Sequence, residues 1–495
     1  MERREFLKWT IGGVSTLYVG TRFPWLRGTE AHAAGATNIL DVFVTDAMKE
    51  MVTHNEINDA RCYFWGYHMH LNGVNVPYEC PAPTIVVTKG DKITFTVTNT
   101  LDEPHAIYIP GPRAGDPPQF DTGPIPPFDQ VTMEFTATEA GAFLYYDNLN
   151  EPVNRVMGLH GALVVLPDAP SGAKYTPYEA SLVTPGVQAL YDDFGSSSHF
   201  PGLAWEQGDP ETGTPPFRQY CWLTHQASPK LFAEVGSYTQ GLDYPAQEFL
   251  DKFLRSPFSK NGDNYNPEFF TINGQSGMFA HFGPFNTPMG RVGEPAVVHI
   301  LNAGLWTHSM HLHANHFYVT AMNGVVAENP IWIDVYNVKP MDRIDYTIPF
   351  MRPPDLPNER GCGYPDTPRA TKNGHPVWPP VEELDVYMPK LGTTAKKQDG
   401  ITDCELGQRQ SPLCYPMHDH SEPSQTAQGG NYNCGLISGI YFLGDRNTAG
   451  HMDFPMDEDF AMMYRGIRGC SGSYDPAGQL KPPEVAKPAC GDEPK

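Results

Sequence analysis

Alternating apolar and polar residues are the clearest pattern in the first third of the chain. Within 81–100, the stretch KITFTVTN places an apolar residue at every second position, with threonines between them. Side chains of a β-strand point alternately to opposite faces, so this pattern predicts a half-buried antiparallel strand. The alternation returns over 130–148, and the apolar run 161–167 follows it. Together these segments predict a β-sandwich domain over about 38–168.

A second series of strand-like segments begins after residue 216 and follows a similar order of strands and glycine-rich turns. These segments are 218–226, 268–277, 295–304, 317–324, 335–348 and 436–444. The order predicts a second copy of the same sandwich over 216–446. We therefore expect an all-β protein with two sandwich domains.

Three further segments have compositions that do not suit a sandwich. Residues 169–215 are rich in Gly, Pro, Ser and Asp and are expected to form a linker with some local structure. Residues 352–412 are rich in proline, contain cysteine, and are expected to interrupt the second domain as a long insertion. Residues 447–495 are acidic and proline-rich and are expected to form an irregular tail.

The N-terminal segment 1–33 has the pattern of an export signal. It starts with a charged stretch, continues through the mildly apolar 9–20, and ends in the A-x-A site 31–33. The pair Arg3-Arg4, followed by Phe-Leu-Lys, resembles a bacterial twin-arginine signal. We therefore expect a periplasmic or secreted protein. A retained membrane anchor is the alternative, but the apolar run is short for a span.

Charge and cysteine content narrow the choice of partners. The chain has 34 basic and 57 acidic residues, a formal net charge of -23, and no basic stripe, so nucleic acid is not an expected partner. Outside the signal no segment approaches 18 unbroken apolar residues, so no stable membrane insertion is expected after signal removal. Nine cysteines without a C-x-x-C spacing suit an oxidising compartment.

Two His-x-His pairs are the candidate chemistry of this chain. His311 and His313 lie in a strand-like segment, and His418 and His420 lie in another. Residues i and i+2 of a strand share a face, so neighbouring strands would bring four imidazoles together. Imidazole suits copper, zinc, iron and nickel. The rival interpretation is a set of hydrogen-bonded core histidines. His308 has the opposite parity and would point to the other face.

These histidine motifs resemble those of the multicopper oxidase family. The string from His308 to His313 resembles the family's H-P-x-H-L-H motif, and 418–420 resembles its H-C-H motif. Residues 81–111 and 140–167 also resemble family segments, with the patterns PGPTI…GD…VTN and PGTFWYHSH…GLYGAL.

The resemblance implies a fold, a metal and an assembly. It implies two cupredoxin-like Greek-key β-sandwich domains, as in two-domain laccases and copper nitrite reductases, which commonly form trimers. It also implies copper as the cofactor, with the ligands His311, His313, His418 and His420. His308, in the position of a type 1 copper ligand, and His105 are secondary ligand candidates.

Departures from the family motifs restrict the expected activity. Asp419 occupies the position of the type 1 copper cysteine, and Tyr108, Pro110, Tyr146 and Asn148 occupy the positions of four further histidines. Without a thiolate no blue copper site of the usual kind is expected. With half of the usual ligands absent, the four-electron reduction of O₂ is not expected either.

Two functions of different classes remain. The first is an exported copper-dependent oxidoreductase that acts on a small molecule or a metal ion, in which Asp419 is a candidate proton relay or a partner of a ligand imidazole. The second is a non-catalytic protein that binds or sequesters periplasmic copper, or a structural cupredoxin. Four histidines would also suit zinc, but the family resemblance favours copper.

Overall fold

The computed structural model describes most of the two predicted sandwich regions. The described residues are 18–20, 37–52, 59–76, 80–167, 176–196, 218–239, 242–255, 265–281, 286–291, 296–313, 315–349, 394–396, 403–405, 414–426 and 435–444.

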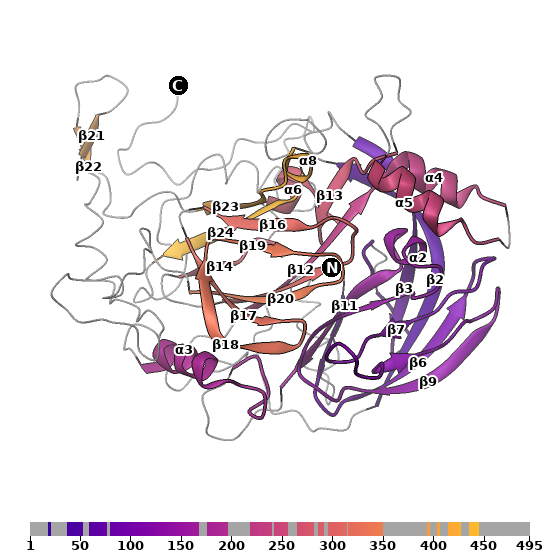
Figure 1. The fold of residues 1–495 in the computed structure, drawn as a ribbon, viewed down its shortest axis with the longest axis horizontal. Coiled ribbons are helices and arrows are strands. Elements are labelled where there is room, and N and C mark those ends of the chain that lie inside the picture. The colour runs from indigo at the N-terminus through magenta and orange to yellow at the C-terminus, as the bar shows by residue number, and fades with distance from the viewer. Residues whose placement is uncertain are drawn as a thin grey trace, which may run out of the picture.

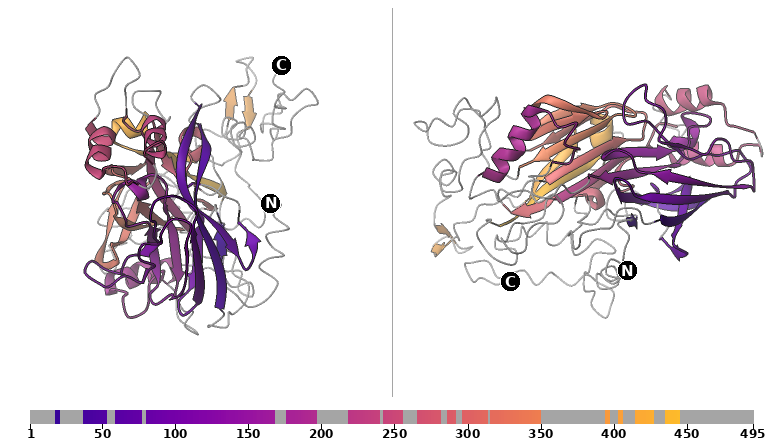
Figure 2. Two further views of the ribbon diagram at one scale, coloured as in Figure 1. Left: turned by 90° about the vertical axis from the view of Figure 1, so that its right-hand side faces the viewer. Right: turned by 90° about the horizontal axis from the view of Figure 1, so that it is seen from below.

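Two sheets form the first sandwich, which lies on the right in Figure 1 and faces the viewer in the left panel of Figure 2. The six-stranded sheet has the order β1 (Tyr18–Gly20), β5 (Thr84–Thr88), β11 (His160–Leu166), β10 (Gly141–Tyr146), β7 (Tyr108–Ile109) and β8 (Phe120–Asp121). The five-stranded sheet has the order β4 (Val74–Asn75), β3 (Asp59–Leu71), β2 (Thr37–Val52), β6 (Lys92–Asn99) and β9 (Gln130–Thr136).

A second pair of sheets forms the second sandwich, at the centre of Figure 1. Its six-stranded sheet has the order β13 (Phe269–Ile272), β12 (Arg218–Ala227), β15 (Ala296–Asn302), β20 (Arg343–Ile348), β17 (Phe317–Met322) and β18 (Val325–Ile333). Its five-stranded sheet has the order β14 (Met289–Arg291), β24 (Ile437–Gly444), β23 (Cys414–Asp419), β16 (His308–Leu312) and β19 (Val335–Val338).

The two sandwiches repeat the same strand topology. In the first, β5 runs parallel to β11, and β10 and β7 follow in antiparallel pairing. In the second, β14 runs parallel to β24, and β23 and β16 follow in the same way. The opposite sheets also correspond, because β2 and β6 pair in parallel, as do β12 and β15. This repetition, with chain crossings between sheets, confirms an all-β fold of two Greek-key sandwiches.

Each sandwich has its own apolar core, as the alternation predicts. In β6, Ile93, Phe95 and Val97 are buried between the sheets, whereas the threonines between them are half-buried on the outer face. In the second sandwich, side chains such as Trp222 and Ile300 meet Met310 from the opposite sheet. Side chains along β6 therefore alternate between the core and the outer face of the sheet.

Central strands of the two six-stranded sheets are buried on both faces because these sheets also pack on each other. Val164 of β11 and Leu223 of β12 belong to one apolar cluster that joins the sandwiches. Every residue of β11 and of β15 is buried. This second buried face explains why 161–167 is an unbroken apolar run and does not alternate.

Polar contacts supplement this apolar joint between the sandwiches. Arg155 is 3% exposed, and its guanidinium donates to the carbonyls of Ala303 and Gly304. His225 lies close to Val156, with its Nε2 atom 2.7 Å from that carbonyl oxygen. The imidazoles of His225 and His160 are stacked obliquely, with ring centroids 4.5 Å apart. The loop that leads into β16 is therefore held by the first sandwich.

Short helices connect or cover the sheets. They are α2 (Val153–Val156), α3 (Pro185–Ser196), α4 (Pro229–Gly236), α5 (Ala246–Arg255), α6 (Gly277–His281) and α8 (Glu422–Gln425). Helix α3, within the predicted linker, packs against β18, and α4 packs against β3. No helix in the described part of the chain is long and apolar enough to cross a membrane.

Several predicted segments lie largely outside the described residues. Of the signal 1–33, only β1 is described, and it pairs with β5 at the sheet edge. Of the insertion 352–412, only β21 (Thr394–Lys396) and β22 (Asp403–Glu405) are described, as an antiparallel pair. The tail 447–495 lies wholly outside.

The buried histidines of the joint predict acid sensitivity. Burial lowers the pKa of His160 to about 3 and lowers that of His225 well below its usual value. The unfolded chain takes up these protons near pH 6.5, so stability is complete above that pH and falls as pH decreases below it.

A His225→Gln variant keeps a donor for the Val156 carbonyl but has no proton to gain. Between pH 7 and pH 5 we expect it to lose about 2 kcal/mol less of its free energy of unfolding than the wild type. Urea titrations at the two pH values measure this difference. Equal losses in both proteins would contradict the assignment of a neutral His225.

Candidate metal centre

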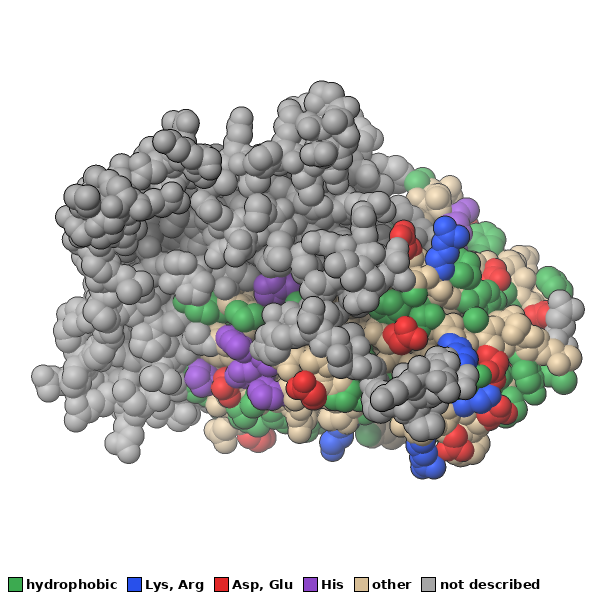
Figure 3. Space-filling view, turned by 90° about the horizontal axis from the view of Figure 1, so that it is seen from above, with side chains coloured by type: hydrophobic (Ala, Val, Ile, Leu, Met, Phe, Trp, Pro, Cys, Tyr) green, Lys and Arg blue, Asp and Glu red, His purple; other side chains and the backbone are tan. Residues whose placement is uncertain are grey.

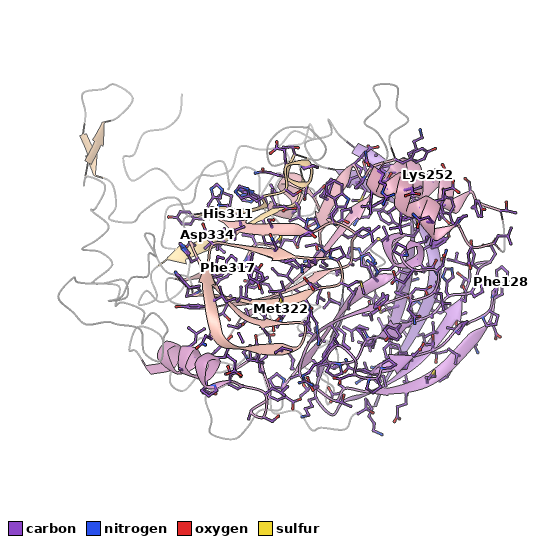
Figure 4. The ribbon with its side chains drawn as sticks, in the orientation of Figure 1. Phe128, Lys252, His311, Phe317, Met322 and Asp334 are labelled. Atoms are coloured by element: carbon purple, nitrogen blue, oxygen red, sulfur yellow. The ribbon has the colours of Figure 1, made fainter. Side chains whose placement is uncertain are left out.

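The two His-x-His segments lie on neighbouring strands of the second sandwich. Strand β16 pairs antiparallel with β23, and the register sets His311 directly opposite His418. Residues opposite each other in an antiparallel pair have Cβ atoms about 5 Å apart. His313 follows β16 on the same face as His311, and His420 follows β23 on the same face as His418. The pairing therefore gathers the four imidazoles at one end of the sheet, near the His311 label in Figure 4.

Ring distances show how closely the imidazoles approach. The ligand nitrogens of His311, His313 and His418 all lie within 4.8 Å of one another. His313 Nε2 is 2.8 Å from His418 Nε2. The His420 ring lies beside this group, with its centroid 5.2 Å from that of His311 and 5.4 Å from that of His418. Three predicted ligands thus form one nitrogen cluster, and the fourth flanks it.

Backbone and amide groups fix the outer nitrogens of two of these rings. His311 Nδ1 lies 2.9 Å from the Asp334 carbonyl oxygen, to which it can donate. His418 Nδ1 lies 3.0 Å from the Asp419 carbonyl oxygen, to which it can donate, and Gln425 Nε2 lies 3.0 Å from the same atom. With Nδ1 engaged, Nε2 of each ring is directed to the cluster. Such partners commonly orient histidine ligands of metals.

Burial favours neutral imidazoles in the cluster. Burial lowers the pKa of His313, and the neighbouring His311 and His420 lower it further. Burial also lowers the pKa of His418, and this effect outweighs the hydrogen bond to Asp419 that favours the protonated ring. A metal binds only the neutral ring, so these shifts keep the ligand nitrogens available at neutral pH.

Solvent reaches one side of the cluster. The side chain of His311 is 19% exposed and that of Asp334 is 44% exposed, and His311 Nδ1 lies 3.8 Å from Asp334 Oδ2. Histidine side chains gather on the upper face of the molecule, with acidic side chains beside them (Figure 3). His418, in contrast, is buried. A metal held here would have one protein-facing side and one open side.

The secondary candidates His308 and His105 lie apart from this nitrogen cluster. His308 is fully buried, as its opposite parity in β16 requires, and its Nδ1 is 2.6 Å from Asp419 Oδ2. His105 belongs to the first sandwich, where its Nδ1 is 2.7 Å from Asp147 Oδ2. In the described residues, these two histidines therefore pair with carboxylates and do not join the candidate ligands.

Asp419, the candidate proton relay, directs its carboxylate inward. Its Oδ1 accepts from the backbone N–H groups of Ser309 and Ser421, and its Oδ2 faces His308. Burial raises the pKa of this carboxyl, but the His308 imidazole and the accepted hydrogen bonds outweigh burial, so the net shift of the pKa is downward. Asp419 is thus a buried carboxylate with both oxygens engaged.

Sequence reasoning did not identify Asp334 or Gln425 as neighbours of the cluster. Asp334 contributes a backbone carbonyl, which any residue could supply, so its side chain carries no signal. Gln425 follows His418 by seven residues and reaches back through the one-turn helix α8. Neither position has a spacing typical of a metal motif.

The donor set fits a borderline metal ion such as copper. Two nitrogens that bind one ion at about 2.0 Å each lie roughly 2.8–3.3 Å apart. The His313 Nε2–His418 Nε2 separation of 2.8 Å, a hydrogen-bond distance between the two rings, also lies in this range. Among the described residues no cysteine joins the cluster, and Cys62, Cys80 and Cys221 are buried elsewhere. The arrangement therefore suits a nitrogen-ligated ion without thiolate.

Comparisons with known proteins find the same family in two regions of the chain. Two family models described as multicopper oxidase match residues 57–170 and 257–350. A copper-containing nitrite reductase from Alcaligenes xylosoxydans xylosoxydans is 28% identical over 191 residues, which cover 36% of this chain and 53% of that relative. The chain thus spans about half the length of this curated relative.

Solved structures of similar proteins include copper enzymes. A blue copper oxidase from Nitrosomonas europaea shows 16% identity and a TM-score of 0.45, over 90% of this chain and 99% of that chain. A copper nitrite reductase from Nitrosomonas europaea shows 14% identity and a TM-score of 0.42, over 82% and 94%.

The two matched regions fall one on each sandwich. Multicopper oxidases and copper nitrite reductases are families that bind copper. The chain is a divergent, cupredoxin-like member of the multicopper oxidase family, a family of copper-binding oxidoreductases.

Proposed function

We propose that this protein is an exported oxidoreductase that acts on a small molecule or a metal ion through a histidine-ligated copper. The ligands in this proposal are His311, His313, His418 and His420. The observation that carries it is the meeting of two His-x-His pairs across the β16–β23 ladder, with three ligand nitrogens within 4.8 Å.

Bound copper would supply one-electron exchange between its two common oxidation states. The chain's own residues provide neutral imidazoles, because burial lowers the pKa of His313 and His418. The carbonyls of Asp334 and Asp419 accept from Nδ1 of His311 and His418 and orient these two rings. The exposed Asp334 carboxylate stands beside His311, where it can take up or release a proton of a substrate at the open side.

The lack of a thiolate supports direct contact between substrate and metal. In this family electrons enter at a type 1 copper held by a cysteine, and the position of that cysteine is Asp419 here. Electrons would then enter from a substrate at the open side of the cluster, where His311 is partly exposed. Small substrates fit this requirement. A proton relay through Asp419 would have to involve His308, the imidazole that it contacts.

The presence of Asp419 in place of the family's cysteine also favours a second candidate, a protein that binds copper without turnover. A histidine site that lacks an electron-entry partner can sequester or deliver copper in the periplasm. Both candidates include export by the twin-arginine route, which the signal-like pattern of 1–33 supports. Both also include a homo-oligomeric, trimeric assembly, which the family resemblance supports.

Copper binding is tested first with paired substitutions. We expect His311→Ala combined with His418→Ala to lower Cu(II) affinity by more than about a hundredfold, since it removes two facing ligands. The matched control is His68→Ala with His70→Ala, another His-x-His pair with ring centroids 5.1 Å apart. Competition titration against a chelator measures the affinities. Unchanged binding in the first variant would exclude this site.

Spectroscopy and turnover separate the two candidate functions. We expect the copper-loaded protein to lack an intense thiolate-to-copper absorption band, because the site holds nitrogen ligands. The oxidoreductase predicts O₂ uptake or dye oxidation with phenols, Fe(II) or Cu(I), and loss of that turnover in the double alanine variant. Copper-loaded protein without turnover on these substrates would favour the binding protein.

A further inference from the structure

A buried histidine–aspartate pair joins β16 to β23 directly beneath the candidate ligands. His308 and Asp419 are both 0% exposed, and His308 Nδ1 lies 2.6 Å from Asp419 Oδ2. Asp419 also accepts from the Ser309 backbone N–H at 2.7 Å. One carboxylate between His418 and His420 thus makes two bonds to the strand that carries His311.

The surrounding amide fixes the proton position in this pair. The Gln226 side-chain oxygen accepts from the Leu305 N–H at 2.8 Å, so its NH₂ group must face His308 Nε2, at 2.6 Å. His308 Nε2 therefore accepts, and Nδ1 carries the proton that is donated to Asp419. Both ring nitrogens are engaged within the protein. His308 acts in the protein as a structural donor and has no free ligand atom.

The first sandwich contains the same arrangement at the corresponding place. His105 Nδ1 lies 2.7 Å from Asp147 Oδ2, and both side chains are 0% exposed. Asp147 Oδ1 accepts from the N–H two residues later, as Asp419 Oδ1 does. The Asp147 N–H donates to Leu159 at 3.0 Å, and the Asp419 N–H donates to Leu436 at 3.0 Å.

Glycines precede both leucines and allow the same close approach. A Cβ atom on Gly158 would lie 2.3 Å from the Trp65 carbonyl oxygen, and one on Gly435 would lie 1.6 Å from the Ser424 carbonyl oxygen. The two sandwiches therefore share one structural unit, which we call the His–Asp clasp: His105–Asp147 in the first and His308–Asp419 in the second.

The two clasps carry different side chains on the sheet face that points away from the core of their own sandwich. In the first sandwich, Tyr108 lies opposite Tyr146, with ring centroids 5.4 Å apart. In the second, His311 lies opposite His418, with ring centroids 5.3 Å apart. The ring spacing is thus the same with tyrosines in one sandwich and imidazoles in the other, so it accompanies the clasp and the paired strands and does not depend on metal-binding side chains.

We propose that the clasp His308–Asp419 is the positioning device of the candidate metal site. It holds β16 against β23 so that His311 and His418 already meet in the metal-free protein. The expected effect of the clasp on copper binding rests on the proposed function. Its effect on the positions of His311 and His418 in the metal-free protein does not. Asp419 and His308 are positioning residues in this proposal and do not bind the metal.

The first sandwich supplies a matched control for the test. Asp419→Asn keeps the shape of the side chain but removes one acceptor oxygen, so at least one of three donors loses its partner. Asp147→Asn makes the same change in the clasp without candidate ligands. We expect both variants to unfold at lower urea concentration than the wild type.

Only Asp419→Asn is expected to affect the metal site. In metal-free protein with ¹⁵N-labelled histidine, the imidazole signals of His311 and His418 should shift in Asp419→Asn and stay in place in Asp147→Asn. Cu(II) affinity should fall about tenfold or more in Asp419→Asn, the range for lost supporting partners of a ligand, with altered copper hyperfine splitting in EPR spectra. Asp147→Asn should keep the wild-type affinity and spectrum.

The outcomes separate this proposal from the proposed function. Unshifted His311 and His418 signals in Asp419→Asn would overturn the clasp, whether or not copper binds. Equal losses of copper affinity in both variants would also overturn it, because they would reflect general destabilisation. If the wild-type protein binds no Cu(II), the copper site is refuted. The imidazole signals of His311 and His418 then still test the role of the clasp.

A second pair of variants serves if Asp419→Asn does not fold. His308→Asn retains a side-chain N–H near the position of Nδ1, whereas His308→Leu retains none. We expect wild-type imidazole signals for His311 and His418 in the first variant and shifted signals in the second. Identical signals in the two variants would contradict the positioning role.

Discussion

The hydrogen-bonded pairing of β16 with β23 is the constraint on which the candidate site depends. More than a hundred residues of chain separate the two strands, and their register alone decides whether His311 faces His418. A shift by one residue would turn every imidazole to the opposite face. The contacts of Asp419 with His308 and Ser309 exclude such a shift, because a buried carboxylate without donors is costly, at roughly 1–3 kcal/mol or more.

The joint between the sandwiches extends this constraint into the first domain. Arg155 satisfies carbonyls of the loop just before β16, and Gln226 joins that loop to His308. The candidate site thus lies at the end of a continuous set of buried polar contacts that starts in the first sandwich. The apolar cluster between the six-stranded sheets keeps water away from these contacts and strengthens them.

Local patterns in the sequence were sufficient for the strands and for the facing of their side chains. The alternation around Phe95 predicted a half-buried strand, and the parity of His308 predicted that it points away from His311. The apolar run at 161–167 predicted a strand, but its alternation is absent because a second sheet covers its other face. The packing of this second sheet is a tertiary contact that no local sequence pattern indicates.

The composition of the site was only partly accessible from the sequence. Two His-x-His spacings define which imidazoles share a face, but the adjacency of their strands came from family resemblance, since long-range pairing has no local pattern. The carbonyl of Asp334 is a backbone group and so escapes any motif. The partnership of His105 with Asp147 spans 42 residues and becomes visible only when the two sandwiches are compared.

The repeated clasp also has a consequence for protein engineering. The first sandwich presents the same frame as the second, with Tyr108 and Tyr146 where the second carries imidazoles. Its backbone is already held by an internal link that needs no ion. A designer could therefore exchange side chains on this prepared surface without first solving the harder problem of aligning two strands. The first sandwich therefore offers a second backbone frame of the same kind for a designed site.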